Sequence, residues 1–100
     1  MSYRKILLEM MDGITDASTR AEIARAFSAI MAGYSANRLD DNKLKAVLVE
    51  FCMDILLVKY PYEDVEKLKP IAQDYATKLY RAIRGATIGE RYFTASGIRE

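Results

Sequence analysis

Residues 44–58 of this chain read LKAVLVEFCMDILLV, and this stretch decides the fold class. Twelve of its fifteen residues are apolar, and only Lys45, Glu50 and Asp54 interrupt them. A bilayer span needs about 20 residues with few charges, so the stretch is too short and too charged to cross a membrane. A helix that is apolar around most of its circumference is buried on several sides. The stretch therefore predicts a central buried helix.

Polar residues on both sides set the limits of this central helix at about 41–59. Asp40 or Asp41 can cap its N-terminus, because a carboxylate there accepts a backbone N–H and complements the helix dipole. The segment Tyr60-Pro61-Tyr62 ends the helix, since a proline ring cannot continue the hydrogen-bond ladder. At 1.5 Å per residue the helix is roughly 28 Å long, about the width of a small domain.

Two further helices are predicted before the central one. Ser2 is a suitable N-cap for a first helix with one apolar face, and Gly13 provides a stop. A second helix is predicted at about 17–36, with its start marked by Thr15, Asp16, Ser18 and Thr19. Thr19 and Glu22 have the spacing of a capping box. This helix carries an apolar stripe and a parallel stripe of small side chains that would let another helix approach closely, formed by Ala24, Ser28, Ala32 and Ala36.

After the central helix, apolar residues recur at steps of three and four from Val65 to Ala82, across Pro70. Either a short helix at 62–68 precedes a second helix that starts at Pro70, or one helix is kinked there. A proline inside a helix costs about 3 kcal/mol, which favours the break. Gly85 is predicted to end the last helix, because glycine disfavours helix and two more glycines follow.

These elements predict an all-α fold, a compact bundle of four to five helices around the central apolar helix. A chain of 100 residues suits one domain, assigned to residues 1–84. Residues 85–100 are predicted to form an extended, irregular C-terminal tail that is either docked or mobile. The net charge of +1 is a cancellation, since residues 40–66 are acidic and residues 75–100 are basic.

Missing residue types exclude whole classes of chemistry. The chain has no histidine and one cysteine, so it cannot build a Cys/His zinc site or a nucleophile with an imidazole base. Cys52 lies in the most apolar stretch and is predicted to be a buried, unreactive thiol, which fits a cytoplasmic setting. Glu50 and Asp54 share a helix face and could hold Mg²⁺, but the favoured interpretation is a polar strip. No catalytic residue, metal or cofactor is predicted.

The function predicted first is a small non-catalytic interaction module that self-associates, most simply as a homodimer. The central helix is more apolar than a four-helix monomer readily covers, and the stripe of small residues invites close packing. Tyrosine is enriched at interfaces. The candidate self-association residues are Ala24, Ser28, Ala32, Tyr60 and Tyr62.

The alternative function is binding of DNA or RNA through the basic C-terminal part of the chain. Cations interleaved with tyrosine and glycine suit a surface that follows phosphates and stacks on bases. The candidate contacts are Lys78, Tyr80, Arg81, Arg84, Arg91 and Tyr92. The chain has only three Asn and Gln residues, and a low content of these residues is found in thermophilic proteins.

Overall fold

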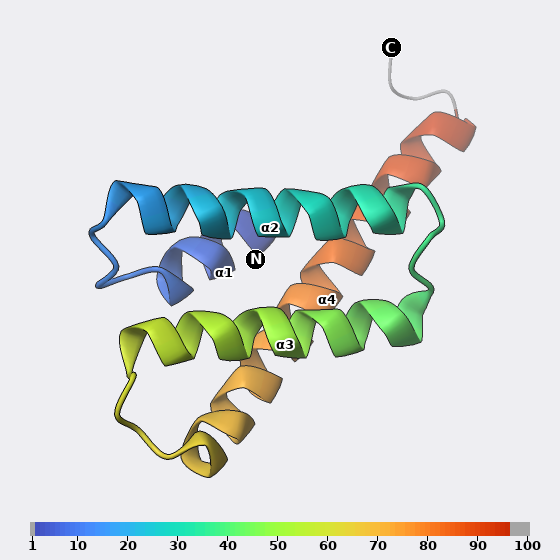
Figure 1. Ribbon diagram of the computed structural model, residues 1–100. Coiled ribbons are helices and arrows are strands. Elements are labelled where there is room, and N and C mark those ends of the chain that lie inside the picture. The colour runs from blue at the N-terminus through green and yellow to red at the C-terminus, as the bar shows by residue number, and fades with distance from the viewer. Residues whose placement is uncertain (1, 97–100) are drawn as a thin grey trace.

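The computed structural model describes the backbone of residues 2–96 and the side chains of residues 2–86. The described backbone forms four helices and no strand, which confirms the predicted all-α class. Figure 1 shows α2 and α3 side by side, with α4 crossing behind them. Within the described residues, no helix is both long and apolar enough to cross a bilayer. The helices are α1 (Tyr3–Met10), α2 (Ala17–Ser35), α3 (Asp41–Lys59) and α4 (Val65–Ser96).

Helix α3 is central, because it packs against both α2 and α4. Its observed bounds confirm the predicted range of 41–59. Asp40 is the N-cap, and its carboxylate accepts the backbone N–H of Lys43 at 2.8 Å. At the other end Tyr60 is the C-cap, and the chain turns at Pro61 as predicted. The buried residues of α3 lie along the face between its two neighbours: Leu44, Leu48, Phe51, Cys52, Ile55 and Leu56.

All four helices contribute to one apolar core. An aromatic chain joins three of them, with Tyr3 of α1 5.5 Å from Phe27 of α2, and Phe27 5.7 Å from Phe51 of α3. Helix α4 adds residues that include Leu79 and Ile83, both fully buried. No polar or charged side chain is buried among residues 2–86, so the stability of the described core comes from apolar burial and packing.

The turn between α1 and α2 is held by side chains that satisfy its carbonyl groups. Arg20 donates to the carbonyls of Met11 at 3.2 Å and Ile14 at 2.8 Å. Lys59, at the end of α3, donates to the carbonyl of Met10 at 3.1 Å. Gly13 has φ of +92°, a left-handed conformation that glycine adopts without steric cost.

The N-cap of α2 is one of the predicted start residues, Asp16, and not Thr19 of the predicted capping box. Asp16 takes this position, and its carboxylate accepts the backbone N–H of Thr19 at 2.9 Å. The hydroxyl of Thr19 also donates to Asp16, at 2.7 Å, and Thr19 lies inside α2, three residues after the cap, so it is not the N-cap of a box with Glu22. Both residue types cap helices well, and the carboxylate three residues earlier starts the helix sooner.

Helix α4 is continuous through Pro70, so the predicted break is wrong, as is the separate helix at 62–68. Asp64 precedes the helix and accepts the N–H of Glu66 at 3.1 Å. Pro70 removes only the bond to the carbonyl of Glu66, and both residues are exposed, so water can replace that bond. Leu68 and Ala72 on either side are buried, and their packing holds the helix together.

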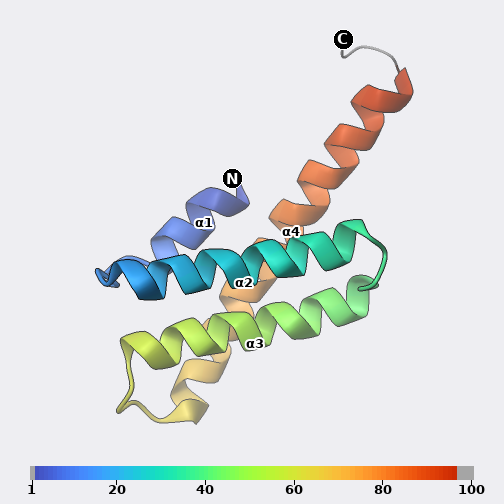
Figure 2. The same ribbon diagram turned by 45° about the horizontal axis from the view of Figure 1, so that its top comes forward.

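The helical backbone also continues past Gly85 to Ser96, so the prediction that α4 ends at Gly85 is wrong. Propagation of an existing helix is far easier than nucleation, and the packed turns up to Ile83 supply the nucleus. Figure 2 shows this last part of α4 extending beyond the other three helices. The sequence predicts that residues 85–100 are either docked or mobile. The side chains that would decide between these states, those of residues 87–100, lie outside the described residues.

Candidate interaction surface

Exposed apolar side chains are concentrated in one segment. Among the described residues, six large apolar side chains are exposed, and five of them fall between residues 58 and 71. Four of these five are 44% to 54% exposed, and Tyr62 is fully exposed at 100%. We call this set the 58–71 surface; its members are Val58, Tyr60, Tyr62, Val65 and Ile71.

The turn between α3 and α4 presents Tyr62 to solvent because the sequence defines it tightly. Pro61 prevents α3 from continuing. The N–H of Glu63 donates to the carbonyl of Tyr60 at 3.1 Å, which closes the turn. Asp64 then caps α4 through the N–H of Glu66. Tyr62 therefore sits at the tip of a short turn with both ends fixed.

An apolar groove of about 210 Å³ lies beside this turn, between the end of α3 and the start of α4. Its floor contains Leu56 and Leu68, which are almost fully buried. Charged groups of both signs stand at its rim. The residues that line it are Leu56, Lys59, Tyr60, Glu63, Lys67, Leu68, Ile71 and Tyr75.

The structure separates the predicted self-association residues into two places. Tyr60 and Tyr62 belong to the 58–71 surface, and Tyr60 also lines the groove. The small residues of α2 are exposed and lie on a different element, so the structure does not bring the two sets together on one turn or groove. These small residues are Ala24, Ser28 and Ala32.

Three residues of the 58–71 surface are missing from the sequence prediction. Val65 follows the apolar seam of α4 in sequence, yet it is 48% exposed because it lies at the first helical position. Ile71 falls between the buried residues Leu68 and Ala72, off the seam. That step off the periodic pattern is the signal that marks Ile71 as an exposed apolar residue.

The apolar excess of α3 does not require a partner chain, contrary to the sequence argument. Of the twelve apolar residues between 44 and 58, only Ala46 and Val58 are exposed. Helices α2 and α4 cover the others at least in part. The apolar residues that suggest a partner chain therefore lie at the C-terminal end of α3 and not at its centre.

Arg84, one of the predicted nucleic-acid contacts, joins three helices. Its guanidinium lies 3.3 Å from Oδ2 of Asp41, at the start of α3, and donates to the hydroxyl of Tyr34 in α2 at 3.3 Å. The Tyr34 hydroxyl in turn donates to Oδ1 of Asp41 at 2.9 Å. The hydrogen bond with Tyr34 and the charge of Asp41 raise the pKa of Arg84. Arg84 thus has a structural role.

Two other predicted contacts also have partners within the chain. Lys78 lies 3.3 Å from the carboxylate of Asp74 and 5.5 Å from the centre of the Tyr75 ring. The half-buried ring of Tyr80 is covered by the ammonium group of Lys45, 4.8 Å from its centre.

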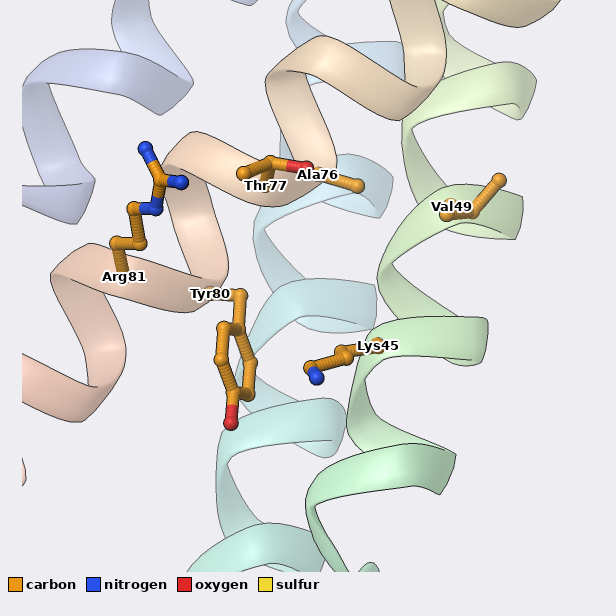
Figure 3. A pocket seen from close by; sticks show the side chains of 6 residues that line it. All are labelled: Lys45, Val49, Ala76, Thr77, Tyr80 and Arg81. Atoms are coloured by element: carbon orange, nitrogen blue, oxygen red, sulfur yellow. The ribbon is translucent and has the colours of Figure 1, made fainter.

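Figure 3 shows the groove of about 350 Å³ at this position, with Lys45 directed toward Tyr80. Arg81 also lines this groove, but its guanidinium points away from Lys45 and Tyr80 (Figure 3). Lys78 and Arg81 line a common pocket that also contains the acidic Glu9. Because Lys78 is paired with Asp74 and Arg84 with Asp41, the described cations of α4 do not form a site of several free positive charges. The side chains of Arg91 and Tyr92 lie outside the described residues.

The remaining chemical candidates are isolated. Glu50 and Asp54 are exposed, and among the described residues no group of three His, Cys, Asp or Glu side chains could hold a metal ion. Cys52 is fully buried, as predicted, and burial raises the pKa of its thiol to about 12.

Comparison of the chain with protein-family models, with curated proteins and with solved structures finds no match.

Proposed function

We propose that this protein is a self-associating helical module that forms a homodimer through the 58–71 surface. The observation that carries the proposal is that five of the six exposed large apolar side chains among the described residues fall between residues 58 and 71, and that two of them, Tyr60 and Ile71, line one apolar groove. Contiguous exposed apolar surface on a small protein marks an interaction site, because its exposure to water is unfavourable. Scattered single residues such as Leu8 would need no such explanation.

The charges around the groove favour a protein partner over a nucleic acid. Glu63 stands on the same rim as Lys59 and Lys67, so the surface has no strong excess of one sign. Lys59 is already engaged with the carbonyl of Met10. A surface that binds phosphates needs several free cations, because each phosphate contact requires one.

Nucleic-acid binding is the weaker proposal, because most of its candidate residues are not free to contact phosphates. Of its candidates with described side chains, Lys78 and Arg84 are paired with carboxylates, and Tyr80 is covered by Lys45. Arg81 is exposed but turned away from Lys45, the other cation of its groove.

Light scattering over a range of protein concentrations tests the proposal. We expect the mass to rise from 11.4 kDa for one chain toward twice that value at high micromolar concentration. Repeating the measurement with short single-stranded and duplex nucleic acid at two salt concentrations tests the alternative. A strict monomer at high micromolar concentration would contradict self-association. Nucleic-acid binding that weakens steeply with salt would support the alternative.

A further inference from the structure

We infer that the dimer is held by reciprocal insertion of Tyr62 of each copy into the groove between α3 and α4 of the other. This inference rests on the proposed self-association and specifies its geometry. In a dimer with two-fold symmetry the same surface serves both partners, so it must offer both a projecting group and its receptor.

The 58–71 surface and the groove beside it offer both parts close together. Tyr62 is fully exposed at the tip of a turn whose ends are fixed by hydrogen bonds. The receptor is the apolar groove of about 210 Å³, whose floor contains Leu56 and Leu68. Tyrosine is suited to such a role, since its ring buries about 150–250 Å² while its hydroxyl can remain at the wet edge. It also loses little conformational entropy when it is fixed.

The rim charges support a second copy as the occupant. Glu63 and Lys67 both line the groove, and Lys67 has no carboxylate within 4.0 Å among the residues whose side chains are described. Two copies related by a two-fold axis can therefore place Glu63 of each opposite Lys67 of the other. A partner with a single sign of charge would leave one of these groups opposed by a like charge.

Tyr62→Ala in the full-length chain tests the inserted ring. Because Tyr62 is fully exposed, the variant should keep the circular dichroism spectrum and melting temperature of the monomeric fold. Loss of a central aromatic anchor should weaken the dimer at least about tenfold, measured by analytical ultracentrifugation. Tyr62→Phe should retain most of the affinity, since the ring remains. Leu8→Ala is the matched control, because Leu8 is an exposed apolar residue of α1 outside the 58–71 surface.

A charge exchange tests the pairing of Glu63 with Lys67 across the interface. Glu63→Lys and Lys67→Glu should each weaken the homodimer, because each variant places like charges opposite one another. An equimolar mixture of the two variants restores both pairs in a heterodimer, so association should recover in the mixture. A pairing within one chain would give no such recovery. Both variants alter exposed side chains, so each should remain folded.

The outcomes separate this inference from the proposed function. If the wild type dimerises and Tyr62→Ala weakens the dimer while Leu8→Ala does not, the inserted ring is supported. If the wild type dimerises and Tyr62→Ala has no effect, self-association stands and the insertion is wrong. Absence of recovery in the mixture would overturn the charge pairing. A wild type that stays monomeric overturns both proposals and leaves the surface to another partner.

Discussion

Asp16 accepts two hydrogen bonds from Thr19, one from its backbone N–H and one from its hydroxyl. Both bonds lower the pKa of Asp16 from its ordinary value of 3.8, and the bond from the hydroxyl has the larger effect. A carboxyl whose pKa is lowered by folding adds stability above its pKa in the unfolded chain. That stability is lost as the pH falls through the lower pKa of the folded state.

Asp16→Asn should therefore lower the melting temperature at neutral pH, although asparagine also caps helices well. The difference from the wild type should shrink as the pH falls below 3.8, because the wild-type carboxylate then becomes protonated. Thermal unfolding followed by circular dichroism between neutral pH and pH values below 3.8 measures this difference. Thr19→Ala should make the pH dependence shallower, since it removes the larger cause of the pKa shift. Identical pH profiles for all three proteins would contradict this assignment.

Cys52 shows how burial of a single residue suppresses the reactivity of its side chain. A thiol acts as a nucleophile or a metal ligand only when it is deprotonated. Burial among apolar side chains raises its pKa to about 12, so at neutral pH the group remains a thiol. Cys52 is therefore a small apolar part of the core of α3, which is the role its sequence neighbours predict.

At the scale of elements, the sequence predicts α3 better than α4. The limits of α3 follow from local features, because Asp40 starts it and Pro61 prevents its continuation. Helix α4 contains a proline at position 70 and a glycine at position 85. Both residues have low helix propensity, so the local sequence predicts helix ends at these positions. Tertiary packing of Leu68, Leu79 and other buried residues outweighs that preference. The exposed Ile71 is instead marked by periodicity, because it falls off the seam that Leu68 and Ala72 follow.

Pro70→Ala should stabilise the protein, since it restores the missing backbone N–H of a continuous α4. The exposed position allows the change without a loss of core packing. We expect the free energy of unfolding to rise by about 1–3 kcal/mol, measured by urea denaturation, because alanine is the better helix former. The lower value allows for the smaller entropy of an unfolded chain that contains proline. Lys69→Ala, at the exposed neighbour, is the control. A loss of stability in Pro70→Ala would indicate that α4 depends on a break at this residue.

At the scale of the whole molecule, the core and the 58–71 surface both lie within residues 2–86. The described core ends at Ile83, and the groove ends at Tyr75. Shortening the chain to residues 1–86 should therefore leave the melting temperature and the self-association nearly unchanged. The same change removes Arg91 and Tyr92, two of the residues on which nucleic-acid binding was predicted to depend. The shortened chain keeps Lys78, Tyr80, Arg81 and Arg84, so nucleic-acid binding should weaken in it while self-association should not.

Three measurements on the shortened and full-length chains check this expected difference: thermal unfolding, light scattering and nucleic-acid binding at two salt concentrations. Retained dimerisation supports the 58–71 surface as the functional part, because that surface is intact in both chains. Loss of dimerisation without loss of fold would place the interface on residues 87–100 instead. A large fall in melting temperature would show that these residues pack on the bundle. Salt-dependent nucleic-acid binding by the full-length chain alone would assign that function to the end of α4, since each phosphate contact adds to the salt dependence.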